Sequence, residues 1–345
     1  MNRQPRLAHA CLAALMGVVA FGSFLQARKA DHRPVKGTIW VANRGDHTIR
    51  GFDAGTGAVV RTVAMAPGSQ PGDLAFAKGK LYVAEEFGTP PAIAIVDEET
   101  GVVIKRISFA SGSRPHHMHA SPGGKLVAAG LFGTDFVAVV DTRDDTLVGV
   151  WDSNPLTTNG RVHAAVFSPD ARTLYLASDA SNEVIALDPR TGQVFWRMTV
   201  PAAHEIVVTH DGKTAYVSRR TANRLAVIDL EKRTFEDLLA LGLPDTLRLS
   251  ANEHLLTVGL RTMPAQLAVV DTRTLVYNLV DLSATGELTT IGGHQWTSRS
   301  GRFTFASFEG GTSPGLPVID HRADNQVVQR LAYPGRPHGV DRARP

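Results

Sequence analysis

The sequence predicts an all-β protein: a seven-bladed β-propeller of four-stranded blades, closed by a carboxyl-terminal strand that joins the first blade. Three observations lead to this fold class. A short apolar run ending in aspartate recurs along the chain, each repeat holds the same order of strands and turns, and the last strand-like run has no partner of its own.

The first observation is the recurring run of β-branched residues before an aspartate. Seven such runs end at Asp53, Asp97, Asp141, Asp188, Asp229, Asp271 and Asp320. The intervals between them are 44, 44, 47, 41, 42 and 49 residues, so seven units of similar size fill the chain after residue 30. A period of about 40 to 50 residues is typical of propeller blades.

The second observation is the constant order of elements within a unit. A strand ends in a turn such as residues 168–172, and a second strand such as residues 174–178 follows. After a polar loop comes the run that ends in aspartate, and a turn such as residues 190–192 leads into a fourth strand. Four short strands without an amphipathic helix between them indicate a propeller blade.

The third observation concerns closure of the ring. The first unit begins at residues 37–43 and lacks a leading strand, whereas residues 336–340 form a strand-like run with nothing after it. Pairing these two segments would leave no free sheet edge between the first and last blades. We therefore expect one ring of seven blades.

Residues 1–30 are predicted to be a signal peptide or an amino-terminal anchor, and residues 31–345 the propeller domain. Arg3 and Arg6 precede an apolar stretch over residues 7–25, as in an export signal. Arg28 and Lys29 stand where a cleavage site prefers small residues, so the alternative is that the leader is not cleaved and remains as an amino-terminal anchor. A periplasmic or secreted location follows, with the membrane as a partner only if the leader is uncleaved.

The leader also accounts for the basic balance of the chain. The whole sequence has 36 basic and 33 acidic residues, a formal charge of +3, but the leader contains four of the basic residues and no acidic one. The remainder carries a charge of about −1, which gives no indication of nucleic acid as a partner. The single cysteine, Cys11, lies in the leader, which excludes disulfides and thiolate metal sites from the domain.

Histidines recur at the entrance to the first strand of several blades. When the units are aligned on the turn after this strand, an imidazole stands at or next to one position in five of the seven blades. These residues are His116 with His117, His163, His204, His294 and His338, and the sixth unit has Asp245. Any one of them could be structural, but the set predicts imidazoles that converge on one rim of the central channel.

Converging imidazoles are the preferred ligands of copper, zinc and iron. Because no thiolate is available, the ligands would be imidazole nitrogens, with the Asp245 carboxylate as a further ligand. Such a set favours copper, with zinc as the alternative. A heme-type cofactor is the weaker expectation. Because neighbouring imidazolium ions repel, the histidines of the metal-free cluster are expected to have pKa values near or below the ordinary value of about 6.5.

The loops between the second and third strands should share the face that carries the histidines. Their charged residues are Arg44, Asp46, Glu85, Glu86, Asp135, Arg219, Arg220, Arg261 and Glu309. Most of these are expected to be solvated. Arg219 and Arg220 are the best candidates for holding an anionic group such as a carboxylate or a heme propionate, because guanidinium groups match such oxygens.

Three second-strand segments carry a family resemblance. Residues 39–43, 81–85 and 215–218 resemble the Tyr-Val-Thr-Asn (YVTN) repeat of bacterial seven-bladed propellers, which are related in fold to cytochrome d1 domains and amine dehydrogenase heavy chains. The resemblance spans about residues 37–345. It implies the fold and leaves the activity open, since one scaffold carries many functions.

A narrower resemblance concerns the histidines. The pair His116–His117 is similar to the doubled histidine of the catalytic copper site of nitrous oxide reductase, another seven-bladed propeller, in which most other blades carry one histidine. His163, His204, His294 and His338 fall where that pattern would put them. The sequence departs from the family at Asp245 and in having no cysteine for the family's cupredoxin domain, so the resemblance implies a smaller copper site.

Three classes of function remain open on the sequence. The leading hypothesis is an exported propeller that binds a transition metal or metallo-cofactor at the histidine rim, where redox activity could follow. The second is a non-catalytic scaffold for an envelope protein or cell-envelope polymer. The third is an enzyme of the propeller lactonase kind, in which imidazoles act as acids and bases on a small substrate.

Overall fold

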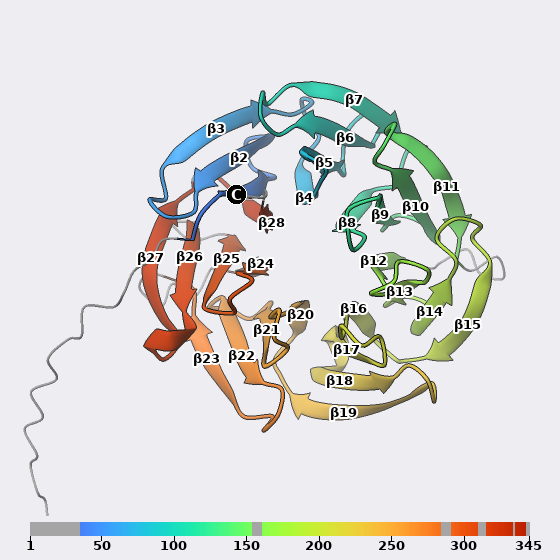
Figure 1. The fold of residues 1–345 in the computed structure, drawn as a ribbon, viewed down its shortest axis with the longest axis vertical. Coiled ribbons are helices and arrows are strands. Elements are labelled where there is room, and N and C mark those ends of the chain that lie inside the picture. The colour runs from blue at the N-terminus through green and yellow to red at the C-terminus, as the bar shows by residue number, and fades with distance from the viewer. Residues whose placement is uncertain (1–34, 154–160, 284–290, 310–314, 334, 343–345) are drawn as a thin grey trace, which may run out of the picture. The chain divides into compact units, whose positions relative to one another are not determined.

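The computed structural model describes residues 35–153, 161–283, 291–309, 315–333 and 335–342, and the predicted leader lies outside them. Within the described residues, strands β1 to β28 form seven four-stranded antiparallel sheets. The sheets stand as blades around a common axis (Figure 1), as the sequence predicts. None of the described residues belongs to a helix of the length and apolar character that a membrane span requires.

The strands are given blade by blade, from the axis outward. Blade 1 contains β28 (Pro337–Arg342), β1 (Thr38–Asn43), β2 (Thr48–Asp53) and β3 (Val59–Ala64). Blade 2 contains β4 (Pro71–Ala77), β5 (Lys80–Glu85), β6 (Ala92–Asp97) and β7 (Val103–Ser108). Blade 3 contains β8 (Pro115–Ala120), β9 (Leu126–Leu131), β10 (Phe136–Asp141) and β11 (Thr146–Asp152).

The remaining blades follow the same order. Blade 4 contains β12 (Val162–Phe167), β13 (Leu174–Ser178), β14 (Glu183–Leu187) and β15 (Val194–Thr199). Blade 5 contains β16 (Ala203–Val208), β17 (Thr214–Arg219), β18 (Arg224–Asp229) and β19 (Thr234–Ala240), with the 3-10 turn η1 (Arg220–Ala222) after β17. Blade 6 contains β20 (Pro244–Leu249), β21 (Leu255–Leu260), β22 (Gln266–Asp271) and β23 (Tyr277–Asp281). Blade 7 contains β24 (Ile291–Thr297), β25 (Phe303–Glu309), β26 (Gly315–Asp320) and β27 (Gln326–Ala332), with the 3-10 turn η2 (His321–Ala323) after β26.

The recurring aspartate ends the third strand of a blade because its carboxylate organises the next turn. Asp53 Oδ1 accepts a hydrogen bond from the Thr56 backbone N–H at 2.7 Å, and Asp97 Oδ1 accepts one from Thr100 N at 2.8 Å. The backbone N–H of Lys232 donates to Asp229 in the same way. Aspartate side chains that bond to the backbone two or three residues ahead favour tight turns, so the sequence period reflects turn chemistry.

The hydrophobic core is divided among the interfaces between blades. The part of the chain that the structure describes contains seven clusters of buried residues, and each joins two neighbouring blades. Tyr82 and Ile93 of blade 2, for example, pack with Met118 and Val127 of blade 3. Because the middle strands are covered on both faces, they read as continuous apolar runs rather than alternating ones.

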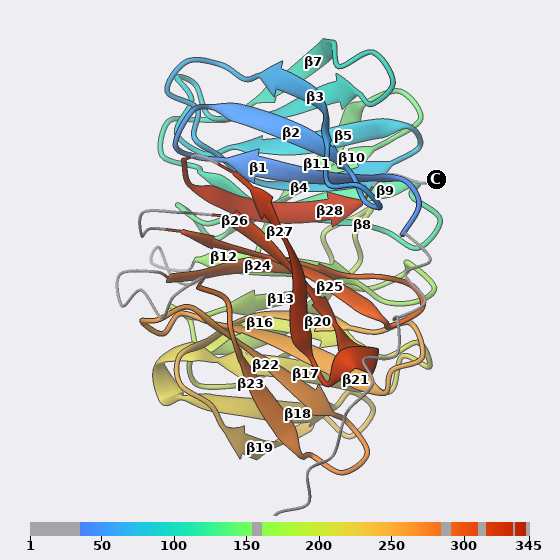
Figure 2. The same ribbon diagram turned by 90° about the vertical axis from the view of Figure 1, so that its left-hand side faces the viewer.

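The ring closes between β28 and β1, as predicted. Val340 pairs with Val41 and Arg342 with Ile39 in antiparallel register, and the two strands lie side by side in the side view (Figure 2). Asn43, fully buried, accepts a hydrogen bond from the Arg336 backbone N–H at 2.8 Å. The first strand of each blade, β28 included, lies nearest the axis (Figure 1), which places the histidine-bearing segments at the centre.

Candidate functional site

The site lies where the first strand of each blade begins. Each of the seven first strands has a register shift at this point, for example between Pro115 and Met118 in β8. A regular strand points consecutive side chains to opposite faces, whereas a bulge can turn both to one side. His116 and His117 therefore both lie at the centre, with ring centroids 4.7 Å apart.

The backbone before several first strands is strained in a way that fixes this entry. Gln70, Arg114, Ala202 and Leu243 directly precede β4, β8, β16 and β20, and they have φ values of 46°, 52°, 63° and 45°. A non-glycine residue in this left-handed region costs about 1–3 kcal/mol and persists only where the surrounding structure holds it. The repeated strain orients the residues that follow toward the axis.

Two successive positions of each first strand supply the side chains at the centre. We call the first position the outer row; it contains Gly72, His116, His163, His204, Asp245, Gly293 and His338. The next position is the inner row; it contains Asp73, His117, Ala164, Glu205, Thr246, His294 and Gly339. The sequence predicted the outer row and, from the inner row, only the two histidines.

The structure brings all six predicted imidazoles together. His117 is central, with ring centroids 4.2 Å from His163 and 4.4 Å from His294. His163 lies 3.4 Å from His204, and His294 lies 4.1 Å from His338 by the same measure. All of them are buried. The trio His116, His117 and His163 has ring nitrogens close enough together to ligate one ion.

A pocket of about 160 Å³ opens onto this cluster. Its lining consists of Arg44, Arg114, His116, His117, Phe132, His163, Arg220, Asp245, Arg261, His294 and His338. His204 is fully buried and does not line it. The pocket is smaller than the roughly 300–1,000 Å³ of drug-sized ligand sites, so it suits an ion or a small molecule.

Three outer imidazoles are oriented by acceptors on the protein. His163 Nδ1 lies 3.0 Å from the His204 carbonyl oxygen, and His338 Nδ1 lies 2.7 Å from that of Gly72. A carbonyl oxygen only accepts, so Nδ1 donates in both cases and the neutral ring keeps its lone pair on Nε2. His116 Nδ1 lies 2.7 Å from Glu86 Oε1. Such bonds to the far nitrogen are typical of metal-ligating histidines.

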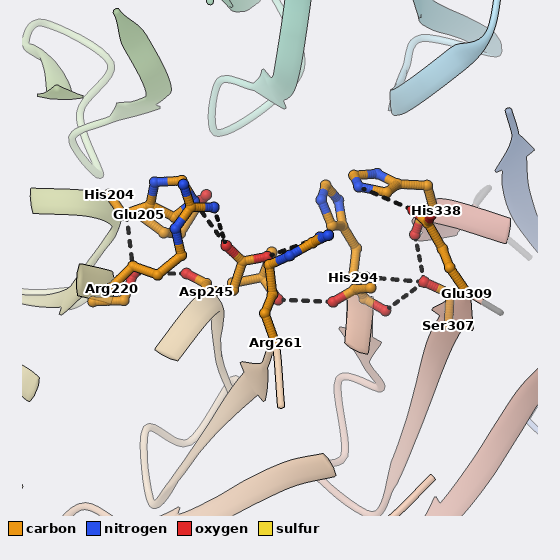
Figure 3. A network of polar contacts seen from close by, with 12 residues as sticks. His204, Glu205, Arg220, Asp245, Arg261, His294, Ser307, Glu309 and His338 are labelled. Atoms are coloured by element: carbon orange, nitrogen blue, oxygen red, sulfur yellow. Dashed lines mark hydrogen bonds and ion pairs between the residues drawn. The ribbon is translucent and has the colours of Figure 1, made fainter. Parts of the chain in front are cut away.

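His204 is engaged differently. Its Nδ1 lies 3.2 Å from Asp179 Oδ2 and its Nε2 lies 2.7 Å from Asp245 Oδ1, so both ring nitrogens face carboxylates. Asp245 also accepts from Arg220 at 3.0 Å and lies 3.8 Å from Arg261, and Figure 3 shows it close to both arginines. Asp245 thus acts in this arrangement as a counter-ion as well as a pocket residue.

The second-strand loops supply a layer of charge behind the pocket. Arg44 forms an ion pair with Glu86 and lies 3.8 Å from Glu309 Oε1, while Arg114 lies 3.5 Å from Glu86 Oε2. Most of these loop residues were expected to be solvated. The structure instead buries Glu85, Glu86, Asp135 and Glu309, because ionic partners surround the glutamates. Gly72 makes room, since a Cβ there would lie 1.6 Å from Glu86 Oε1.

The two arginines predicted to hold an anionic group lie in different surroundings. Arg220 lines the pocket beside Asp245. Arg219 does not line it: its side chain donates to the Pro201 carbonyl oxygen at 2.8 Å, forms an ion pair with Asp237 and packs over Phe235. Arg44, Arg114 and Arg261 join Arg220 at the pocket instead.

The inner row holds carboxylates that the sequence prediction missed. Asp73 and Glu205 are buried; Asp73 Oδ1 lies 3.4 Å from His294 Nδ1, and Glu205 Oε2 lies 3.0 Å from His117 Nδ1. His119 Nε2 lies 3.4 Å from Glu205 Oε1. Asp73 and Glu205 stand one residue after the outer-row position in their blades, as His117 does. Extending the alignment by one residue would have found them.

Burial and neighbouring charges set the ionisation of these groups. Burial lowers the pKa of His116 to about 4, although Glu86 opposes the shift, and it lowers the pKa values of His163, His294 and His338 as well. His117 differs from the predicted behaviour. Burial alone would lower its pKa, but the carboxylates of Glu205 and Asp73 raise it above the ordinary value.

The arrangement allows two kinds of chemistry. Neutral imidazoles with oriented rings can ligate a transition metal, and His116, His117 and His163 have ligand atoms within 4.8 Å of one another. The residues present therefore fit such an ion. His116 paired with Glu86, with arginines beside it, can also act as a general base near a bound anion.

Solved structures similar to this chain are propellers. The periplasmic gluconolactonase PpgL of Pseudomonas aeruginosa is 20% identical over 89% of this chain and 99% of its own, with a TM-score of 0.67. A putative 6-phosphogluconolactonase of Bacteroides uniformis is 15% identical over 90% and 100%, with a TM-score of 0.68. Dihydro-heme d1 dehydrogenase NirN, in complex with DHE, is 17% identical over 88% and 75%, with a TM-score of 0.62. At these identities the likeness shows the fold alone.

Curated protein sequences gave no match. The sequence profile of the family described as "Lactonase, 7-bladed beta-propeller" matches residues 90–265, which is just over half of the chain. That region runs from blade 2 to blade 6 and contains His116, His117, His163, His204 and Asp245. The chain therefore belongs to the seven-bladed β-propeller lactonase family.

Proposed function

We propose that this protein binds a transition-metal ion among the outer imidazoles, with copper favoured and zinc as the alternative. The carrying observation is the anchoring of Nδ1 in His116, His163 and His338, which leaves one ring nitrogen of each for a ligand. The donor set around the pocket is rich in nitrogen, which imidazole-binding metals prefer. The similarity of His116 and His117 to the pair of nitrous oxide reductase points the same way.

The small pocket sets limits on the ligand. At about 160 Å³ it accommodates a metal ion with a small anion, whereas a tetrapyrrole is much larger. A heme-type group is therefore the weaker proposal for this site. The pocket arginines Arg44, Arg114, Arg220 and Arg261 would hold the anion next to the metal. When bound, the metal would supply a Lewis acid or a redox centre.

Calorimetry tests the metal proposal. Copper or zinc at a hundredfold excess over its dissociation constant should stabilise the fold by about 2.7 kcal/mol. The shift in melting temperature should be large at pH 7 and much smaller at pH 5, where protons compete for the nitrogens. Replacing His116 and His117 by alanine should abolish it, whereas His210→Ala, on an exposed turn, should not. An unshifted wild-type transition, with no metal co-purified, would contradict the proposal.

The second candidate function is hydrolysis of a small anionic lactone. It is favoured by family membership and by the four pocket arginines, which match a carboxylate or phosphate. In this scheme His116, supported by Glu86, removes a proton from water, and the water oxygen bonds to the lactone carbonyl carbon. The ring C–O bond then breaks, and His116 returns the proton to the leaving oxygen to give a hydroxy acid. Glu86 and Asp245 would orient imidazoles and arginines rather than touch the substrate.

A pH-stat assay of metal-free protein separates the two candidates. The enzyme hypothesis predicts hydrolysis of anionic lactones, slower turnover of neutral ones, and a loss of about 100-fold or more in rate for His116→Gln. Insensitivity to His116→Gln would exclude this role. If the protein neither binds metal nor hydrolyses lactones, the scaffold hypothesis, with an envelope protein as partner, becomes the best account. In all cases we propose an exported protein, periplasmic or secreted.

A further inference from the structure

The inner row contains buried ligand atoms that the outer metal site does not use. Asp73, Glu205, His117 and His294 are each 1% exposed or less. His294 Nδ1 lies within ion-pair distance of Asp73 Oδ1, and His117 Nδ1 of Glu205 Oε2, while Glu205 Oε1 lies 3.4 Å from His119 Nε2. None of these atoms makes a hydrogen bond of acceptable geometry. A buried polar atom without a hydrogen-bond partner destabilises the folded state, so several at one place indicate a ligand.

The charge balance of the inner row points to a cation. Asp73 and Glu205 are two buried carboxylates, and burial of an ionised group is unfavourable unless an opposite charge compensates it. The nearest arginine is Arg248, whose Nη1 lies 3.9 Å from Glu205 Oε1, and its side chain is 21% exposed. Without a bound cation, compensation of the two carboxylates depends on this distant guanidinium and on protonation of His117, whose pKa they raise; a divalent cation would balance both charges directly.

We infer that Asp73, Glu205, His117 and His294 form a second, deeper cation site with mixed oxygen and nitrogen donors. Ligand atoms of Asp73, His117 and His294 lie within 4.8 Å of one another, as do those of His117, His119 and Glu205. The first trio offers two imidazoles and one carboxylate, a set typical of Fe²⁺ sites, and carboxylates also suit Mn²⁺. The occupant is therefore a divalent first-row ion of the Mn²⁺, Fe²⁺ or Zn²⁺ class.

His117 stands between the two sites without making them one. Its Nδ1 lies 3.0 Å from Glu205 Oε2 and 4.0 Å from Asp73 Oδ2, so this nitrogen belongs to the deeper site and leaves Nε2 for the outer one. His163 and His338 belong to the outer site alone, and Asp73 and Glu205 to the deeper one alone. The two sites can therefore be altered separately without changing His117.

The packing around the inner row preserves space for this site. Gly339 occupies the inner-row position of blade 1, and a Cβ there would lie 2.3 Å from Asp73 Oδ1. Beyond the inner row, a second cavity of about 820 Å³ is lined by Phe76, Ala120 and Thr297 among others. These three residues follow Asp73, His117 and His294 by three positions on the same strands, so this cavity lies farther along the first strands than the deeper site.

Metal titration of the full chain tests the inference. Mn²⁺ is the probe, followed by its electron paramagnetic resonance signal and by metal analysis after dialysis, because oxygen-containing sites suit it better than all-imidazole ones. Wild type should bind one equivalent of Mn²⁺. Asp73→Asn with Glu205→Gln should weaken binding at least tenfold, whereas His163→Gln with His338→Gln should retain it. Circular dichroism of each variant confirms that it is folded.

A parallel titration with Cu²⁺ separates failure of this inference from failure of the proposed outer site. Loss of Cu²⁺ binding in the His163→Gln, His338→Gln variant with retention in Asp73→Asn, Glu205→Gln supports two sites. No Mn²⁺ binding by wild type, or equal Mn²⁺ binding by wild type and the carboxylate variant, overturns the deeper site whatever copper does. Copper binding that is unaffected by the outer variant overturns the outer site alone.

Discussion

His204 Nε2 lies 2.7 Å from Asp245 Oδ1, although the two residues occupy the same position in neighbouring blades. If every blade carried histidine at this position, two imidazoles would be in contact here. The aspartate places a carboxylate against the imidazole instead and also faces Arg220 and Arg261. One position thus joins blades 5 and 6 and sets a negative charge between two arginines at the pocket.

Removing this carboxylate should destabilise the ring. In Asp245→Ala, Arg220 and the fully buried His204 each lose one of two carboxylate neighbours and keep Asp179, and loss of a hydrogen bond to a charged group costs about 1.5–3 kcal/mol. Urea unfolding measures the change. The matched control is Asp237→Ala, which removes the more exposed partner of Arg219 and should cost less than about 1 kcal/mol. Equal losses in the two variants would show that the pocket carboxylate carries no special stabilisation.

Asp341 should make stability depend on pH. Desolvation of the partly buried carboxyl, aided by the charge of Asp73, raises the pKa of Asp341 to about 6, although the backbone N–H of Phe76 donates to it. The folded state thus favours the protonated form, so the stabilisation is full below the ordinary pKa of 3.8 and is lost as the pH rises through about 6.

Asp341→Asn, which keeps an acceptor for Phe76 N, should therefore melt above wild type at pH 7.5. The two proteins should converge near pH 4. Thermal unfolding at both pH values is the measurement, and an advantage of the variant that is the same at pH 4 and pH 7.5 would contradict the assignment to Asp341.

Loss of β28 should open the ring. Deleting residues 336–345 exposes an edge on β1, removes Val340 from the core between blades 1 and 7, and should cause aggregation or a large fall in melting temperature. Val340→Asp should act in the same direction without shortening the chain, whereas Val328→Asp, at an exposed position, should be nearly neutral. An unchanged melting curve for the deletion would disprove closure by β28.

The leader prediction is tested on the expressed protein. Mature protein is expected to begin near residues 28–31 and to be recovered outside the cytoplasm. Amino-terminal sequencing of the envelope and periplasmic fractions measures this. A sequence that starts at Met1 in the membrane fraction would instead support the uncleaved anchor.

The blade architecture was predictable because it depends on local chemistry. Aspartates such as Asp53 and Asp229 bond to the backbone of the following turn, and that requirement recurs in every blade with its own sequence signal. Closure was predictable because the segment around Val340 had no partner within its own unit. Both inferences needed only short-range patterns and the rule that sheet edges are paired.

The site was predictable only in part. The outer row could be aligned, so the sequence predicts His163 and His204 together, but regular strand alternation gave no reason to expect a carboxylate at the next residue to face the axis. The bulges turn that residue to the axis as well, and Asp73 and Glu205 were missed for this reason. The side chains of Arg219 and Arg220 also lie in different places, because η1 begins at Arg220. Arg219 pairs with Asp237, whereas Arg220 pairs with Asp245 at the pocket.

The position of His338 on β28 links ligand binding to closure of the ring. This strand follows the other strands of the ring in the sequence, yet it supplies an imidazole to the pocket and the final hydrogen-bonded partner of β1. A nascent chain in which β28 has not yet been made lacks both. Any ligand that needs His338 can therefore be loaded only after β28 has been made and has paired with β1, so occupancy of the pocket marks a closed ring.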